Sequence, residues 1–428
     1  MPETPPALGE RFAASPAPPP ELAGATPAGG DAAEVVMRLG RALHGAGNAA
    51  HRIEEGMEVA ARRLGLAGQF FSTPTALFAA FGDGAGGARR TILERVRPGE
   101  VNLERMAELD GLLADLASGE LDPARAAARL GPLDRAPRWG AALGTVSFAL
   151  ISGAAAQFLG GGAREVAAAA ALGLLVGGLA SLAARAPAVG RLFEPLAALL
   201  ASFAATVAAV AWPPLSVLLV MLAGIIVLVP GLTLTVAISE LATRQLVSGS
   251  ARLMGAVAIF FGIALGVAVG GRLGAALVGT PQPFEPEPLG ALWRWPALLA
   301  AAAALTVLLR ARPRDAGWIL LGGVLAIEGV RLGGLLLGPQ LGAFLGALAV
   351  GVGGNLYARV GHRPAQMVQV PGLILLVPGS LGFRSLAALL EQDVLAGVQT
   401  AFTTTLVAIA LATGILLANV VLPPRRIL

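Results

Sequence analysis

The sequence contains no cysteine and only three histidines, His44, His51 and His362. Disulfides and cysteine-based metal sites are therefore excluded, and there are too few imidazoles for a histidine-rich metal centre. We expect neither a metal ion nor any other cofactor in this protein.

Lysine is also absent, so every basic side chain is an arginine. A phosphate-binding loop of the Gly-x-x-x-x-Gly-Lys-Ser/Thr type needs lysine, which disfavours an ATP-driven pump within this chain. Most arginines lie in the amino-terminal region and in short loops between apolar runs. That placement is typical of membrane proteins, so the high isoelectric point does not indicate a nucleic-acid partner.

Charge of either sign is scarce: 14% of the 428 residues are charged, 55% are hydrophobic, and the mean hydropathy is +0.73. Charged residues are concentrated outside the apolar runs. This composition predicts an α-helical polytopic membrane protein whose surroundings are a lipid bilayer.

One stretch, residues 227–253 (VLVPGLTLTVAISELATRQLVSGSARL), breaks an apolar run at Pro230-Gly231 and continues as a helix with a polar stripe. Inside a bilayer, a broken helix is tolerated only where its free backbone groups are buried in protein or face a water-filled cavity. The break is therefore a candidate binding site, with hydroxyl groups from Thr233, Thr235 and Ser239 nearby. The alternative is an interfacial helix on which Glu240 and Arg244 form a surface ion pair one turn apart.

The same pattern recurs about 148 residues later, where LLVPGSLGFRSL carries Pro378, Gly379 and Ser380. The flanking sequence keeps step, because Arg164-Glu165 before one apolar run corresponds to Arg314-Asp315 before another. An internal repeat of this kind indicates two homologous membrane halves.

Before the membrane region, residues 1–30 are rich in proline, alanine and glycine and are expected to be a disordered tail. Residues 31–137 have a soluble composition and predict a cytoplasmic α+β domain with two amphipathic helices, a hairpin from 69–81 and 89–96, and a third helix capped by Asn102. The cluster His51-Arg52-Ile53-Glu54-Glu55 opens the second helix. We find no partner for it in acid–base or metal chemistry, so a solvated helix start is favoured.

Ten apolar segments follow, and each half of the membrane region holds five of them. With the amino terminus inside, Arg164, Arg272, Arg294 and Arg384 lie outside and most other loop arginines inside, which fits the positive-inside rule and places both termini in the cytoplasm. An odd number of spans per half makes the second half inverted. The predicted units are 138–273 and 295–428, joined by an extracytoplasmic loop at 274–294. The predicted spans are 139–159, 166–182, 196–211, 215–229, 253–269, 296–309, 318–337, 341–357, 367–377 and 395–422.

The fourth and ninth spans fall short of a full crossing before their Pro-Gly, so each is expected to cross as two half-helices with a break. In the seventh span, Glu328 and Arg331 lie one turn apart, where an isolated charge is costly. We expect them to pair, and Glu328 is a second candidate for proton coupling beside Glu240.

These motifs resemble the threonine/serine exporter family of bacterial membrane proteins. The resemblance rests on LGRALHGAGNAAHRIEEGMEVAARRLGL, FSTPTALFAAF, VPGLTLTVAISELATRQLVSGSARL and LLVPGSLGFRSL, and it spans nearly the whole chain after residue 30. It implies a secondary exporter in the bacterial inner membrane, powered by the proton motive force, with the soluble domain in the cytoplasm. It also implies importance for the following residues: His51, Arg52, Glu54, Pro230, Gly231, Glu240 and Arg252.

The resulting hypothesis is a secondary exporter of threonine and serine that works by alternating access. The helix amino termini after Gly231 and Gly379 would attract the substrate carboxylate, the nearby hydroxyls would bind its polar groups, and Glu240 would carry the proton. The alternatives are an exporter of small dicarboxylates such as succinate, as in split relatives of the family, or a channel. We do not expect an enzyme. The oligomeric state stays open, with a homodimer among the options.

Overall fold

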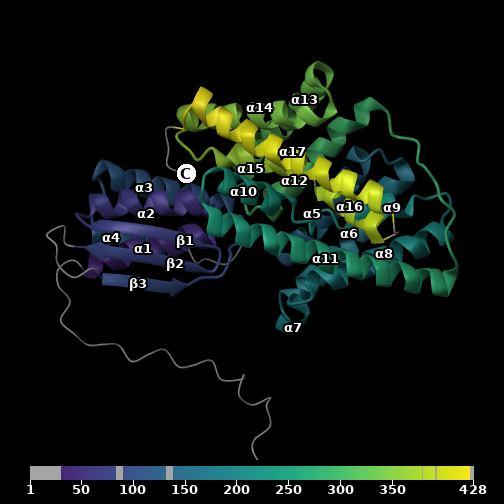
Figure 1. Ribbon diagram of the computed structural model, residues 1–428, viewed down its shortest axis with the longest axis horizontal. Helices are drawn as coiled ribbons and strands as arrows, with labels where there is room; N and C mark the ends of the chain where they lie inside the picture. Colours follow the sequence, from purple (N-terminus) through teal and green to yellow (C-terminus); the bar gives the residue numbers. More distant parts are fainter. Residues whose placement is uncertain (1–29, 83–89, 132–137, 378, 391–392, 425–428) are drawn as a thin grey trace, which may run out of the picture.

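The computed structural model describes residues 30–82, 90–131, 138–377, 379–390 and 393–424. Of the tail predicted at 1–30, only Gly30 is among them, and Pro378 is not. The chain forms an amino-terminal unit, residues 30–131, which lies at one end of a long helical bundle (Figure 1).

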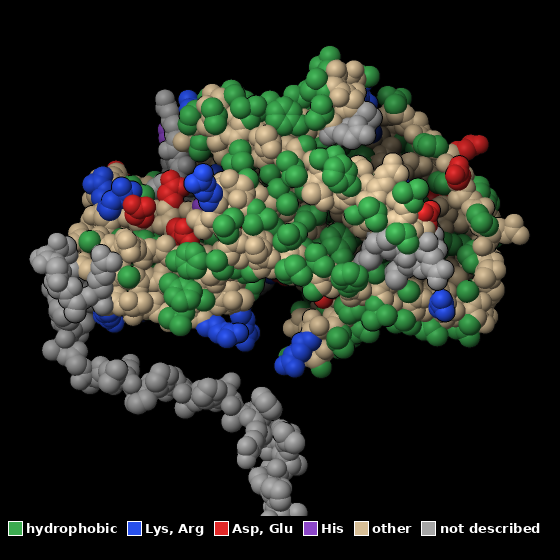
Figure 2. Space-filling model, viewed as in Figure 1, with side chains coloured by type: hydrophobic (Ala, Val, Ile, Leu, Met, Phe, Trp, Pro, Cys, Tyr) green, Lys and Arg blue, Asp and Glu red, His purple; other side chains and the backbone are tan. Residues whose placement is uncertain are grey.

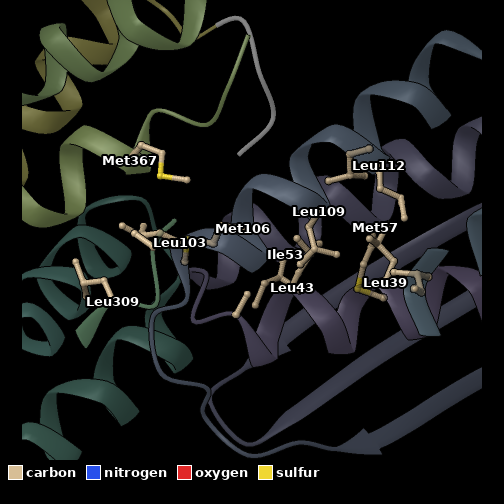
Figure 3. Packing of buried hydrophobic residues seen from close by; sticks show 14 of the residues in the cluster. Leu39, Leu43, Ile53, Met57, Leu103, Met106, Leu109, Leu112, Leu309 and Met367 are labelled. Carbon is tan, nitrogen blue, oxygen red and sulfur yellow. The ribbon is translucent and has the colours of Figure 1, made fainter. Parts of the chain in front are cut away.

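The amino-terminal unit packs helices over one face of a three-stranded antiparallel sheet of order β1-β2-β3. Leu39 and Leu43 from the first helix meet Ile53 and Met57 from the second in its core (Figure 3). The elements are α1 (Gly30–Gly45), α2 (Ala50–Arg63), β1 (Ala67–Thr73), β2 (Ala76–Gly82), β3 (Arg90–Arg95), α3 (Leu103–Ser118) and α4 (Pro123–Leu130).

Both amphipathic helices are confirmed, and so is the cap of the third, since Asn102 Oδ1 accepts a hydrogen bond of 2.9 Å from Arg105 N. The hairpin is incorrect in one respect: the run 69–81 is two strands rather than one. Pro74 has no backbone donor for a ladder, and the chain reverses between Thr73 and Ala76, where the Thr73 side chain accepts from Ala76 N at 3.0 Å.

The bundle is almost entirely helical, and hydrophobic side chains cover it while most charges lie toward its ends (Figure 2). Within the described ranges, nine segments are long and apolar enough to cross a membrane, which supports a multi-pass membrane protein. The helices are α5 (Ala141–Phe158), α6 (Ala163–Ala183), α7 (Pro187–Gly190), α8 (Phe193–Ala211), α9 (Val217–Gly224), α10 (Gly231–Ala242), α11 (Leu246–Val278), η3 (Ala291–Trp293), α12 (Arg294–Leu308), η4 (Pro313–Asp315), α13 (Ala316–Leu337), α14 (Pro339–Gly361), α15 (Gln366–Leu376), α16 (Gly379–Leu390) and α17 (Val394–Val421).

Both predicted breaks are confirmed. The segment at 215–229 is helical only as α9, turns between Ile225 and Val229, and resumes as α10 at Gly231. The segment at 367–377 is α15, which ends at Leu376, and α16 begins at Gly379. Each Val-Pro-Gly turn therefore separates two half-helices.

The fifth span is longer than predicted: α11 covers Leu246–Val278 rather than 253–269, so the helix continues into the loop expected at 274–294. Gly270, Gly271 and Arg272 do not end the helix. An exposed arginine near a helix end can extend its charged head to the membrane surface, so Arg272 is compatible with a continuing helix. The helix ends at Gly279, whose φ of 88° is readily adopted only by glycine.

Corresponding helices of the two halves make corresponding contacts: α8 packs on α11 and α10 on α11, as α14 packs on α17 and α16 on α17. Their directions differ with respect to the amino-terminal unit. Trp139, before α5, donates to Ala311 O at 3.0 Å, and Leu103 N donates to Leu309 O at 2.9 Å, so α5 begins and α12 ends beside that unit. Similarly, α11 begins there and α17 ends on that side (Figure 1).

Candidate functional site

The two Val-Pro-Gly breaks lie against each other through their valine and glycine residues. A Cβ atom on Gly231 would overlap Val377 Cγ1 and lie 3.4 Å from Gly379 Cα, and a Cβ on Gly379 would come within 2.7 Å of Val229 Cγ1. The valine of each turn thus occupies the space beside the glycine of the other. Only glycine fits at either position without moving its neighbour.

Because α10 begins at Gly231 and α16 at Gly379, the amino termini of two half-helices meet at this contact. Unpaired backbone N–H groups at a helix start favour an anion. Thr233 and Ser380 are half-buried near it. Ser239 is also half-buried, but it is eight residues along α10 from Gly231, or about 12 Å. Thr235 is buried and its hydroxyl donates to Gly231 O at 3.2 Å, so that side chain is engaged by its own helix.

Glu240, also on α10, is fully buried, and its partner is not the predicted one. Arg252 Nε lies 3.0 Å from Glu240 Oε2, and Ala50 N, at the start of α2, donates to Glu240 Oε1 at 3.0 Å. The Glu240–Arg244 pair is incorrect because α10 ends before Arg244, which has a φ of 66° and is exposed in the turn to α11. Glu240 is nine residues beyond Gly231, which is about 13 Å along a helix, so it belongs to a second site.

That second site is the junction between α2, β1 and the start of α11, and Glu54 is its centre. Its carboxylate accepts from Ser72 N at 2.7 Å and from Gln245 Nε2 at 2.8 Å, while Ser248 Oγ donates to Ser72 O at 2.6 Å. Burial raises the pKa of Glu54, the two hydrogen bonds oppose the rise, and the Glu240 charge adds to it. Glu54 is thus not the solvated charge expected at a helix start.

His51 and Arg52, on the same helix as Glu54, are half-buried, whereas Glu55 is exposed. Burial, with a smaller contribution from Arg52, lowers the pKa of His51 to about 4. Burial lowers the pKa of Arg52 as well, and the charges of Glu55 and Asp110 act in the opposite direction. At neutral pH His51 is therefore neutral and packs as an uncharged ring beside a cation.

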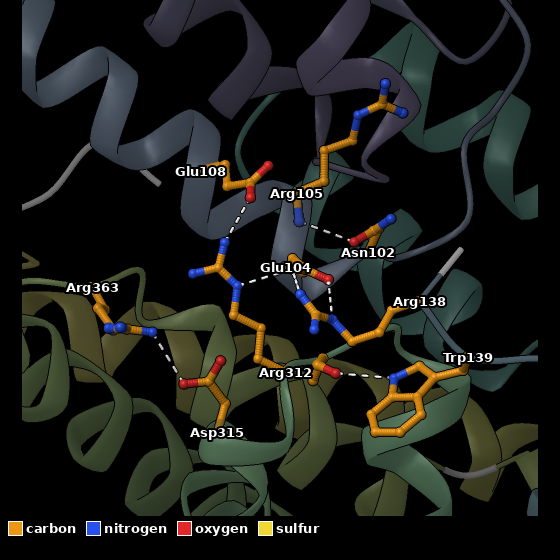
Figure 4. A network of polar contacts seen from close by, with 10 residues as sticks. Asn102, Glu104, Arg105, Glu108, Arg138, Trp139, Arg312, Asp315 and Arg363 are labelled. Carbon is orange, nitrogen blue, oxygen red and sulfur yellow. Dashed lines mark hydrogen bonds and ion pairs between the residues drawn. The ribbon is translucent and has the colours of Figure 1, made fainter. Parts of the chain in front are cut away.

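A separate group of ion pairs joins the amino-terminal unit to the connection between α12 and α13 (Figure 4). Glu104 Oε1 accepts from Arg138 Nη2 at 2.6 Å and from Arg312 Nε at 3.0 Å, and Arg312 Nη2 donates to Glu108 at 2.6 Å. The hydrogen bond from Arg138, followed by that from Arg312, holds the pKa of Glu104 below its usual value. Leu103, Met106, Leu309 and Met367 share one apolar cluster, which continues the core from the unit into the bundle (Figure 3).

Glu328 pairs with Arg331 at 2.8 Å, as predicted, and also lies 3.6 Å from Arg294. Sequence spacing identifies a partner one turn away but not one on another helix. The same limit applies to a buried chain of amides: Gln369 Nε2 donates to Asn355 Oδ1 at 3.0 Å, and Asn355 Nδ2 to Asn419 Oδ1 at 2.9 Å. The only signal for Gln369 and Asn419 is that they are polar residues in apolar runs.

Among the residues placed by the structure, no group of three or more His, Asp or Glu side chains could hold a metal ion. The polar groups of the two sites are backbone N–H groups at two helix starts and hydrogen-bonded or ion-paired side chains at the junction.

Comparison with known proteins covers both halves of the chain. Residues 34–274 match a family model described as a threonine/serine exporter, and residues 297–421 match a second threonine/serine exporter model. The chain is 27% identical over 334 residues to the threonine/serine exporter of Corynebacterium glutamicum, covering 76% of this chain and 67% of that protein.

Fungal proteins are similar too. Pheromone-regulated membrane protein 10 of Yarrowia lipolytica is 26% identical over 392 residues, covering 86% of this chain and 32% of the relative, and that of Candida albicans is 27% identical over 369 residues, covering 82% and 33%. The chain thus spans about a third of the length of these fungal relatives. No solved structure matches it.

Proposed function

This chain belongs to the threonine/serine exporter family, and from that premise we propose that it exports small hydroxylated amino acids, threonine and serine, by proton-coupled alternating access. The observation that carries the proposal is the reciprocal packing of the two Val-Pro-Gly turns, with Val229 beside Gly379 and Val377 beside Gly231. A site made of equivalent parts from two halves is the arrangement from which a carrier can open to either face.

The directions of the helices support an inverted repeat. Since α5 and α11 begin beside the amino-terminal unit, whereas α12 and α17 end there, equivalent helices run in opposite directions. The proposed architecture has ten membrane elements, of which α9 with α10 and α15 with α16 are the two broken ones. The amino-terminal unit lies on the cytoplasmic side, where most loop arginines are found.

We place the substrate between the starts of α10 and α16. Its carboxylate takes the free N–H groups after Gly231 and Gly379, because a helix amino terminus carries partial positive charge. Pro230 precedes the start of α10, and Thr233 and Ser380 offer hydroxyls for the ammonium and hydroxyl groups. Ser239 lies too far along α10 to join them. Thr235 contributes through the shape of the helix start, since its own hydroxyl is bonded to Gly231.

Glu240 couples the proton to movement of the amino-terminal unit in this scheme. Protonation removes the charge that pairs with Arg252 and weakens the hydrogen bond from Ala50 N, so proton binding loosens the contact between α10 and α2. Arg252, Arg244, His51, Arg52 and Glu54 form the gate at this junction. Glu328, held by Arg331 and Arg294, is the second proton-coupling candidate in the other half.

The test is counterflow and gradient-driven transport of threonine, serine and succinate in proteoliposomes, with and without a pH gradient. We expect threonine and serine to be carried, and transport by Glu240→Gln to lose its dependence on the gradient. Glu58→Gln is the matched control, because Glu58 is an exposed glutamate on α2.

Three results would count against the proposal. Transport of succinate in preference to threonine would show that the proposed substrate is wrong. Ion currents in planar bilayers would show that the protein is a channel rather than a carrier. An unchanged response of Glu240→Gln to the gradient would remove Glu240 from the coupling role.

A further inference from the structure

In the first half, a buried carboxylate holds the connection that leads into the first broken helix. Glu165, in the first turn of α6, is 2% exposed. Its Oε2 accepts from Gly162 N at 3.0 Å, which caps its own helix, and its Oε1 accepts from Ser216 N at 3.3 Å. Ser216 is the residue before α9, and Arg164 Nη1 donates to Pro213 O at 2.8 Å in the same connection.

In the second half, Asp315 has the equivalent position and a similar contact. It immediately precedes α13, is 2% exposed, and its Oδ1 accepts from Arg363 Nη1 at 3.1 Å (Figure 4). Arg363 lies between α14 and α15, that is, in the connection that leads into the second broken helix. Arg314-Asp315 and Arg164-Glu165 are also the matching pairs of the internal repeat.

The two carboxylates lie at opposite ends of the bundle. Asp315 follows Arg312, which pairs with Glu104 and Glu108 of the amino-terminal unit. Glu165 is beside Gly162, whose backbone approaches Glu287 O in the connection between α11 and α12, at the end where α11 stops. Each face of the bundle therefore has one carboxylate that fixes the entry to one broken helix.

We infer that Glu165 and Asp315 are paired positioning residues of the transport cycle, and that each holds one face of the bundle closed. Glu165 does so through Ser216 and the half-helix α9, and Asp315 through Arg363 and the half-helix α15. The inference rests on the proposed alternating-access function. A hydrogen bond to a buried carboxylate is strong because little water competes for it. The half-helices α9 and α15 are only 8 and 11 residues long, so releasing the connection at one end leaves the half-helix free to move. Both contacts are formed in this structure.

The absence of cysteine makes a direct test practical, because one introduced thiol reports alone. The reporter is Thr233→Cys, half-buried beside the first turn, and the probe is a membrane-impermeant maleimide applied from either side of oriented vesicles. We expect Asp315→Asn to raise the labelling rate from the side of the amino-terminal unit roughly tenfold, the change that about 1.4 kcal/mol produces. Glu165→Gln should raise labelling from the opposite side only.

Arg363→Gln breaks the same contact by removing the residue that binds Asp315. It must therefore raise labelling from the same side as Asp315→Asn, and it provides the test if Asp315→Asn folds poorly. Asp393→Asn is the matched control, since Asp393 caps α17 away from both connections and accepts from Ala396 N at 3.1 Å. Equal labelling from both sides, reversed sides, or no change in Arg363→Gln would overturn the inference.

Because labelling needs no substrate, the two proposals can fail separately. If labelling is raised from the expected sides but threonine and serine are not transported, only the proposed substrate is rejected. If threonine is transported but the variants do not change labelling from the expected sides, only the paired role of Glu165 and Asp315 is rejected.

Discussion

A charge on His51 is costly because its ring is partly buried and the charge of Arg52, the next residue in the chain, opposes a second positive charge. Both conditions disfavour the imidazolium, and together they lower its pKa from 6.5 to about 4. In the unfolded chain the ring takes up a proton near pH 6.5. In the folded protein the ring binds that proton only when the pH falls to about 4. Between about pH 6.5 and pH 4 the unfolded state therefore binds more protons than the folded state.

The folded chain should therefore lose stability as the pH falls from about 6.5 to 4, by roughly 3 kcal/mol from His51 alone. We expect the thermal midpoint of the full chain to drop between pH 7 and pH 5, and the drop to be smaller in His51→Gln. Glu54, whose raised pKa acts in the opposite direction, is present in both proteins, so their difference isolates His51. Equal drops in both would show that His51 is not the source.

For single residues, the sequence predicts which side chains belong to a site better than it predicts the residues that they contact. Glu240 stands out because it is acidic and follows a break, but its partners, Arg252 and Ala50, come from another helix and another unit. Arg244, the neighbour one turn away, lies beyond the end of the helix that would have aligned it. Pairing by i,i+4 spacing holds only where the helix continues, as it does for Glu328 and Arg331.

Among the elements, α11 is the longest, and it packs on α8 through glycines. A Cβ on Gly270 would overlap Leu199 O, and a Cβ on Gly266 would overlap Pro195 O. Close backbone approach through small residues is the main way helices associate in a bilayer, where water does not drive them together.

Gly270→Ala should accordingly separate α8 from α11 and lower the thermal midpoint, at a cost of roughly 1–3 kcal/mol as for other overpacked sites. The matched control is Gly255→Ala in the same helix, where no atom lies within 4 Å of the added Cβ and better helix propensity should leave stability equal or higher. Thermal unfolding in detergent compares the two. Similar midpoints for both variants would contradict the α8–α11 contact.

Element types and breaks are well predicted from hydropathy and Pro-Gly signals, while lengths are not. A strand pattern does not reveal that Pro74 divides 69–81 into β1 and β2, because aromatic and β-branched residues continue on both sides. For α11, the window 253–269 misses the ends because Ser248 and Arg272 lower the local hydropathy although the helix runs through them. Tertiary contacts, such as Ser248 with Ser72, stabilise those end turns.

For the whole molecule, the amino-terminal unit is attached to both halves of the bundle. It reaches α10 and α11 through Glu240, Glu54 and Ser72, and the α12–α13 connection through Glu104 and Arg312. Sequence analysis predicts the unit but not its attachment, since hydrogen bonds and ion pairs across 190 or more positions leave no local pattern. A unit bound to both halves is well placed to respond when one half moves against the other.

The central claim is that the two Val-Pro-Gly turns meet and must separate for a substrate to pass. A Cβ on Gly379 would lie 3.4 Å from Val229 Cβ, close to the separation in a disulfide, and the chain has no other cysteine to interfere.

The most direct measurement is threonine transport by the Val229→Cys, Gly379→Cys double variant before oxidation, after oxidation and after reduction. The account predicts that oxidation forms the cross-link and stops transport, and that reduction restores it, with each single variant insensitive to oxidant. The account would be contradicted if the cross-linked protein transported threonine as fast as the reduced protein does, or if the two cysteines never formed a cross-link.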